Sequence, residues 1–145
     1  MKIQELRLGN LVSELVLGIV TISVIKPDTV WVTAKHMRTD GLIENAQYHL
    51  DISSIEPVVL TEEWLLKFGF KQEVHNNNKL NWWNLPKGNN YQAHHLMKMQ
   101  NSWTWFIDFD DCDADNDCHL VKGFDYVHEL QNICHALTEY ELEIK

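Results

Sequence analysis

The first sixty residues alternate short apolar runs with turn residues, a pattern typical of a small all-β fold. Turn chemistry at 26–28 and at 38–41 separates the runs, and residues 53–58 indicate a single 3₁₀ turn before a short last strand. The longer predicted strands are 11–15, 18–25, 29–35 and 46–52. Five short strands in this order predict an SH3-like small β-barrel over 1–59, although the same pattern is also compatible with an open meander.

A helix with clear boundary signals follows at 61–68. Thr61 is placed to cap the first turn, and Glu62 and Glu63 suit the positive end of the helix dipole. Gly69 favours a left-handed end to the helix. Because this helix has only two turns, we expect packing to stabilise it rather than intrinsic helix propensity.

The rest of the chain combines an antiparallel meander with one amphipathic helix. Predicted strands at 80–85, 91–99, 102–109 and 118–124 are separated by polar turns. The final helix, 125–138, has apolar residues at helical spacing, with Asp125 as its expected cap. The sequence therefore predicts a second, α+β unit over 60–145 whose sheet packs against the C-terminal amphipathic helix.

Composition places the chain among cytoplasmic globular proteins. Three cysteines without CxxC spacing argue against a secreted disulfide framework, and no stretch reaches the roughly 18 apolar residues of a membrane span. The opening residues lack the apolar run of a signal peptide. The formal net charge of −9 lies entirely in residues 102–145, which hold eleven acidic and two basic residues.

Three stretches resemble an uncharacterised family of small proteins from prophages and mobile elements of Bacteroidetes. They are LRLGNLV near the start, IEPVVLTEEWLLKFGF in the middle and YVHELQNICHALT near the end. The resemblance spans almost the whole chain and implies a mobile-element origin, but it implies no reaction. The chain departs from the family pattern in two ways: Glu139 follows Thr138 where the pattern has glycine, and the acidic stretch is extra.

That stretch, DFDDCDADNDCH at 108–119, holds six aspartates, two cysteines and a histidine. As a calcium loop starting at Asp111, it has Asn116 where glycine is needed and Lys122 where a bidentate glutamate is needed. Its zinc candidates match no common ligand spacing. Those candidates are Cys112, Cys118 and His119, with His128 or His135 as a fourth ligand. We therefore predict no metal and no cofactor.

Enzymatic chemistry is not indicated. Neighbouring aspartates raise the pKa of a thiol such as Cys112, which opposes its use as a nucleophile. The chain also has no glycine-rich phosphate loop. The sequence favours a non-enzymatic binding protein.

The principal hypothesis is that the acidic stretch imitates a run of phosphates and docks into a basic groove of a host protein. Given the implied origin, its sharpest form is an anti-defence inhibitor that binds a CRISPR effector nuclease or its guide-RNA complex. Trp82 and Trp83 are adjacent in a predicted strand, so one of them is expected to face outward as a partner-binding residue. The candidate partner-binding aspartates are Asp108, Asp110, Asp111, Asp113, Asp115 and Asp117.

Two other hypotheses stay open. The first is an RNA-binding accessory module that uses a basic end of the N-terminal barrel, formed by Lys26, Lys35, His36 and Arg38. The second is a structural or regulatory phage protein. An acidic face that only keeps the protein soluble is the non-functional explanation of the same charge pattern.

Overall fold

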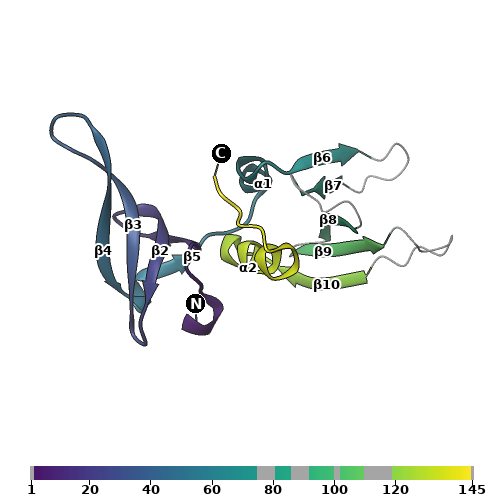
Figure 1. The fold of residues 1–145 in the computed structure, drawn as a ribbon, viewed down its shortest axis with the longest axis horizontal. Coiled ribbons are helices and arrows are strands. Elements are labelled where there is room, and N and C mark those ends of the chain that lie inside the picture. The colour runs from purple at the N-terminus through teal and green to yellow at the C-terminus, as the bar shows by residue number, and fades with distance from the viewer. Residues whose placement is uncertain (1, 75–80, 86–91, 100–101, 110–118, 145) are drawn as a thin grey trace. The chain divides into compact units, whose positions relative to one another are not determined.

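The computed structural model describes the chain except residues 1, 75–80, 86–91, 100–101, 110–118 and 145. The described residues form a mixed α+β protein with two five-stranded antiparallel sheets and two α-helices (Figure 1). The chain divides into two compact units, one of 1–59 with 126–133 and one of 60–125 with 134–145. The sequence predicts that all of 60–145 belongs to the second unit, whereas in the structure 126–133 belong to the first.

The first unit is an antiparallel meander whose strand order is β4-β3-β2-β1-β5. A 3₁₀ turn, η1 (Ile3–Glu5), precedes the sheet, and another, η2 (Ile52–Ser54), precedes the last strand. The strands are β1 (Leu11–Glu14), β2 (Gly18–Ile25), β3 (Thr29–Met37), β4 (Ile43–Asp51) and β5 (Ile55–Pro57). The predicted strands are therefore present in the expected order, but the 3₁₀ turn is shorter than the predicted 53–58, and the last strand lies within that range.

Alternation along the strands builds the core of this unit. In β3, the even positions Val30, Val32 and Ala34 are buried, because successive side chains of a strand point to opposite faces. The same core also contains Leu6, Val12, Val20, Ile22 and Ile55. In the described part of the chain, the edge strands β4 and β5 do not pair with each other, so the sheet is open and barrel closure is not confirmed.

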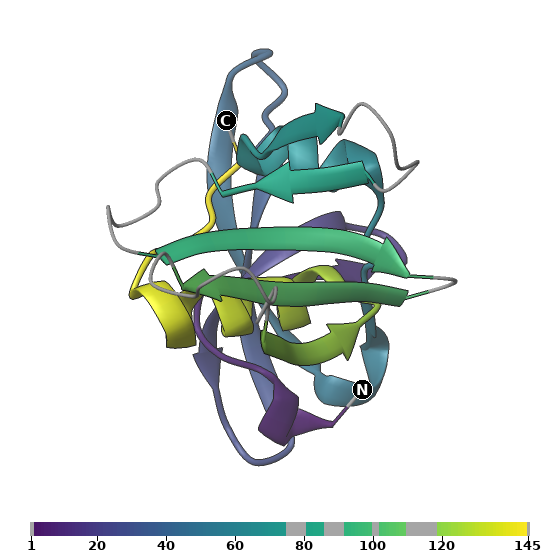
Figure 2. The same ribbon diagram turned by 90° about the vertical axis from the view of Figure 1, so that its right-hand side faces the viewer.

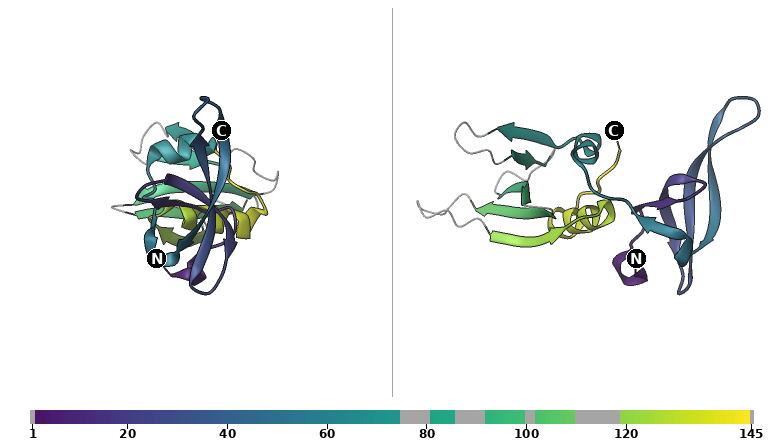
Figure 3. Two further views of the ribbon diagram at one scale, coloured as in Figure 1. Left: turned by 90° about the vertical axis from the view of Figure 1, so that its left-hand side faces the viewer. Right: turned by 180° about the vertical axis from the view of Figure 1, so that it is seen from behind.

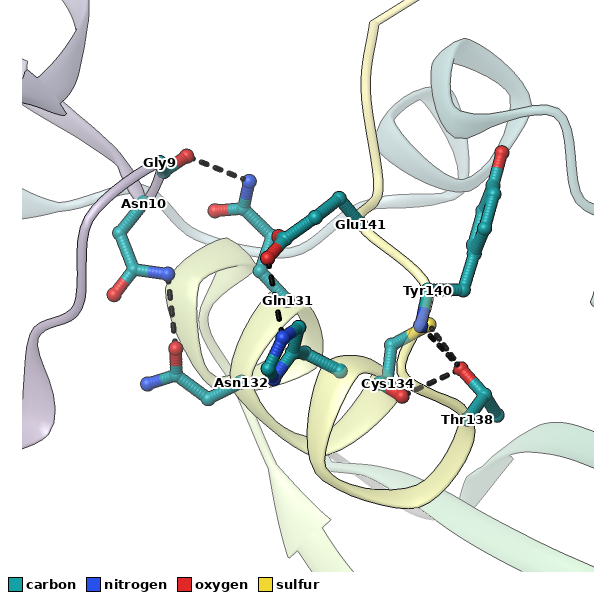
Figure 4. Close-up of polar contacts among 9 residues, drawn as sticks. Gly9, Asn10, Gln131, Asn132, Cys134, Thr138, Tyr140 and Glu141 are labelled. Atoms are coloured by element: carbon teal, nitrogen blue, oxygen red, sulfur yellow. Dashed lines mark hydrogen bonds and ion pairs between the residues drawn. The ribbon is translucent and has the colours of Figure 1, made fainter.

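A turn before β1 is bonded to helix α2 (Val127–Thr138) through two adjacent amide side chains (Figure 4). Gln131 accepts from the Leu11 N–H at 2.8 Å through Oε1 and donates to the Gly9 carbonyl at 3.1 Å through Nε2. Gly9 has a φ of 85°, a left-handed conformation that glycine adopts readily. Gln131 is only 3% exposed; its bond to Leu11 is buried and its bond to Gly9 is partly buried within the first unit.

Asn132 and Asn10 extend this connection. Asn10, fully buried, accepts from the Arg7 N–H at 2.8 Å and donates to the Asn132 side chain at 2.9 Å. Asn132 in turn donates to the Glu5 carbonyl at 2.7 Å. We call Asn10, Gln131 and Asn132 the amide clamp, because together they satisfy polar groups of the turn that no strand of the sheet satisfies.

The second unit begins with α1 (Glu62–Phe68) and continues into a sheet of order β10-β9-β8-β7-β6 (Figure 2). Its strands are β6 (Lys71–Val74), β7 (Asn81–Asn84), β8 (Gln92–Met99), β9 (Ser102–Phe109) and β10 (His119–Phe124). The antiparallel meander is confirmed. The sequence missed β6, because KQEV is short and polar.

Aromatic residues dominate the core of this unit. Trp83 meets Trp103 edge-on, with ring centroids 6.4 Å apart and planes at 77°. The Trp103 indole N–H donates to the Leu60 carbonyl at 3.1 Å, which satisfies a buried donor. Trp105 and Phe68 are also almost fully buried.

Helix α1 has the expected ends but not the expected cap bond. Thr61 occupies the N-cap with extended dihedrals, yet its side chain makes no capping hydrogen bond. Gly69 ends the helix with a φ of 85°, as predicted. The N–H of Phe70 donates to the Leu65 carbonyl at 3.0 Å, the bond pattern of a Schellman ending.

Helix α2 starts two residues later than predicted. Tyr126, and not Asp125, directly precedes it, and the Glu129 carboxylate accepts from the Tyr126 N–H at 3.2 Å. The helix ends at Thr138, after which Glu139 takes a φ of 57° and donates its N–H to the His135 carbonyl. Glu139 thus adopts a conformation that glycine adopts with less strain. No helix within the described ranges combines the length and apolar character needed to cross a membrane.

Gln131→Ala should lower the free energy of unfolding by about 1–3 kcal/mol, because it leaves the buried Leu11 N–H without its partner and breaks the bond to the Gly9 carbonyl. Chemical denaturation would measure the change. Gln131→Glu keeps the acceptor but sets a buried carboxylate against the Gly9 carbonyl oxygen, so it should destabilise at least as much. A loss below about 0.5 kcal/mol in Gln131→Ala would contradict a stabilising role for the clamp.

Glu139→Gly should raise the free energy of unfolding by about 1 kcal/mol, because glycine relieves the left-handed strain at the end of α2. Thermal denaturation would detect this as a higher melting temperature. Glu139→Ala is the matched control, since it removes the charge and retains the strain. Equal stabilisation by alanine and glycine would assign the effect to charge instead.

Candidate functional site

The acidic stretch connects two paired strands. Strand β9 ends at Phe109 and β10 begins at His119, and these strands pair antiparallel with His119 opposite Ile107. Asp108 lies in β9 opposite Ala93, and its side chain is outside the described residues. Also outside them are Asp110, Asp111, Asp113, Asp115 and Asp117.

Further acidic residues of the same unit are described. Glu139, Glu141 and Glu143 follow α2 and are exposed. The Glu141 carboxylate lies 3.4 Å from the His135 ring, and both side chains are close to half exposed. These three glutamates therefore add to the negative charge of the second unit at positions accessible to solvent.

The structure describes the side chain of only one of the two adjacent tryptophans. Trp83 is 2% exposed and packs against Trp103, so it is a core residue with no free surface for a partner. Trp82 is opposite Met97 in the sheet, and its side chain lies outside the described residues. The expectation of one outward tryptophan therefore falls on Trp82 alone.

The zinc candidates are not brought together where the structure describes them. His128 is buried and stacks on Tyr126 with ring centroids 5.9 Å apart, whereas His135 faces Glu141. Cys112 and Cys118 lie outside the described residues, as does the side chain of His119. Among described residues, no group of three or more His, Cys, Asp or Glu is placed to hold a metal ion.

The four basic residues of the first unit do not gather at one end of the sheet. The Lys26 N–H donates to the Thr29 carbonyl in the turn that begins β3, whereas Lys35 lies six residues further along the strand. At about 3.4 Å per residue, the part of β3 that holds Lys35 lies about 20 Å from the turn that holds Lys26. The expected basic cluster of Lys26 with Lys35, His36 and Arg38 is therefore wrong.

Nor do the remaining three form one basic patch. Lys35 and His36 are neighbours in a strand, so their side chains point to opposite faces. Arg38 lies 3.4 Å from both Asp40 and Glu44, which offset its charge. This end of the sheet presents little net positive charge.

An aromatic pair lies on the same strands. The Trp31 and His49 rings are 5.2 Å apart and tilted by 34°, and the two residues are directly opposite each other in β3 and β4. Lys35 shares the Trp31 face, four residues along. The sequence alone does not reveal this pair, because its two members are 18 positions apart and the register of their strands does not follow from local patterns.

The β3–β4 hairpin is another feature that the sequence did not identify. Beyond the Thr21–Thr33 pair, β3 has no partner in β2, and the hairpin continues as a two-stranded arm (Figure 3). Met37, Leu42 and Ile43 at its end are 71%, 62% and 69% exposed. Apolar residues directly on both sides of the predicted turn at 38–41 were the available signal.

Comparisons with known proteins add no identity to these features: no protein-family model, no curated protein and no solved structure matches the chain.

Proposed function

We propose that this chain is a non-enzymatic binding protein whose acidic second unit docks into a basic, nucleic-acid-binding groove of a host protein. The observation that carries the proposal is the segregation of charge. Residues 102–145 contain eleven acidic and two basic residues, whereas the rest of the chain is balanced. Such asymmetry favours a basic protein surface and opposes binding to a phosphate backbone.

The placement of the acidic stretch supports this reading. It joins two strands of a sheet whose described core holds Trp83, Trp103 and Trp105, so a packed scaffold carries both of its ends. Binding residues on a loop that a rigid scaffold positions are common in proteins. The resemblance to mobile-element proteins extends the proposal to an anti-defence inhibitor, with a CRISPR effector nuclease as the specific partner.

A second candidate function is RNA binding by the first unit, and the Trp31–His49 pair favours it. A partly buried tryptophan ring against an exposed histidine ring, with Lys35 four residues along on the same face, suits base stacking. The strand order with a 3₁₀ turn before β5 favours an SH3-like fold of the kind first predicted. RNA binding that weakens steeply with salt and is lost in Trp31→Ala would establish this function in place of the first.

The principal test is affinity capture from a bacterial host, with and without nuclease, using the native chain and two neutralised variants. In the first variant, Asp110, Asp111, Asp113 and Asp115 become Asn. We expect it to bind the captured protein about tenfold or more weakly, with most of the difference in the association rate at low salt.

The matched control changes Glu139, Glu141 and Glu143 to Gln, which alters the net charge similarly elsewhere in the second unit. It should retain most of the affinity if the acidic stretch is the docking site. Equal loss in both variants would indicate general electrostatic attraction. A four-aspartate variant that binds as tightly as the native chain would exclude the proposed site.

A further inference from the structure

Strand β4 is an unprotected edge of the first sheet. Natural proteins shield edges with short strands, proline, bulges or charge, since an open edge can pair with another chain. The opposite edge, β5, has three residues and ends in Pro57. Strand β4 has nine residues, contains no proline or glycine, and pairs with β3 at nine consecutive positions without a bulge.

The backbone groups on the outer side of β4 can be assigned from its two ends. The Arg38 N–H donates to the Leu42 carbonyl, and the Ile52 N–H donates to the Asp28 carbonyl. In an antiparallel pair the bonded positions alternate, so even-numbered residues of β4 face β3. The N–H and C=O groups of Asn45, Gln47 and His49 therefore point outward, at the spacing that another extended strand would match.

The same strand begins at the exposed apolar end of the arm. Leu42 and Ile43 are 62% and 69% exposed, so two neighbouring large apolar side chains are open to solvent at this end. Arg38, the cation beside them, is already offset by Asp40 and Glu44. A neutral, extended protein segment therefore fits this edge better than an anionic polymer.

We propose that β4 pairs antiparallel with β4 of a second copy of this chain, about a two-fold axis at Ala46. In this register Asn45 and Gln47 face each other across the new pair, and Glu44 faces Tyr48 of the second copy. Leu42 comes opposite Leu50, and Ile43 opposite His49. The register thus joins amide with amide, carboxylate with phenol and leucine with leucine, and it covers Ile43 with the ring of His49.

The alternative two-fold registers are less favourable. An axis at Gln47 places Ile43 opposite Asp51 and Glu44 opposite Leu50, and an axis at Tyr48 leaves Ile43 outside the paired region. The axis at Ala46 also puts the smallest side chain of the strand where the two copies come closest. Residues 1–59 contain seven acidic and five basic residues, so net charge opposes the pairing only weakly.

A disulfide at the axis tests this register directly. In a background with Cys112→Ser and Cys118→Ser, Ala46→Cys places two thiols at facing positions about 4.5 Å apart between Cα atoms, within disulfide range. We expect a covalent dimer with oxidised glutathione. Gln47→Cys is the matched control, because its two copies would be about 9 Å apart, beyond that range. Failure of Ala46→Cys to cross-link, or equal cross-linking of the control, would overturn the proposal.

Sedimentation equilibrium of the native chain gives the second test, and it should show a monomer–dimer equilibrium. Gln47→Pro removes an outward N–H and should weaken dimerisation about tenfold or more, whereas Gln47→Thr keeps the N–H and should have little effect. Melting temperatures would confirm that both variants fold. A native chain that is monomeric at all concentrations overturns the proposal. If, in addition, Gln47→Pro loses capture of the host protein while Gln47→Thr keeps it, the partner of β4 is a strand of another protein.

Discussion

The first unit depends on two amide side chains of α2, Gln131 and Asn132, which bond to backbone groups that no neighbouring strand of the described sheet bonds to. Gly9 and Leu11 lie where the chain turns into β1, and Gln131 bonds to backbone groups of both from the start of α2. A buried backbone group without a partner costs as much as a lost hydrogen bond, so this turn is stable only with the helix in place. The amide clamp therefore explains why 126–133 belong with the N-terminal meander.

The clamp also gives a physical meaning to two of the three stretches that suggested a family. Gly9 and Asn10 lie in LRLGNLV, and Gln131 and Asn132 lie in YVHELQNICHALT, and these residues bond to one another. The pattern shared by those stretches thus describes how the first unit is held together. It is independent of the acidic stretch, which is where we place the interaction with a partner.

Local patterns predicted most of the fold. The bounds of β2 and β9 agree with the sequence, because alternation and turn residues act over a few positions. Strand β6 was missed because a short polar segment becomes a strand only through its pairing with β7. The clamp was beyond prediction, since Gln131 and Leu11 are 120 positions apart. By contrast, the separation of Lys26 from Lys35 was already implied by the predicted strand 29–35, because an extended strand places these two residues at its opposite ends.

The position of Trp31 has an optical consequence. It is the single tryptophan of 1–59, and the other five lie between residues 64 and 105. Its ring lies against the exposed imidazole of His49, whereas Trp83, Trp103 and Trp105 are enclosed. Replacing Trp31 by phenylalanine would leave a chain whose tryptophan fluorescence comes from the second unit alone. The difference from the native spectrum would then isolate the emission of the meander, so one instrument can follow the unfolding of each unit separately.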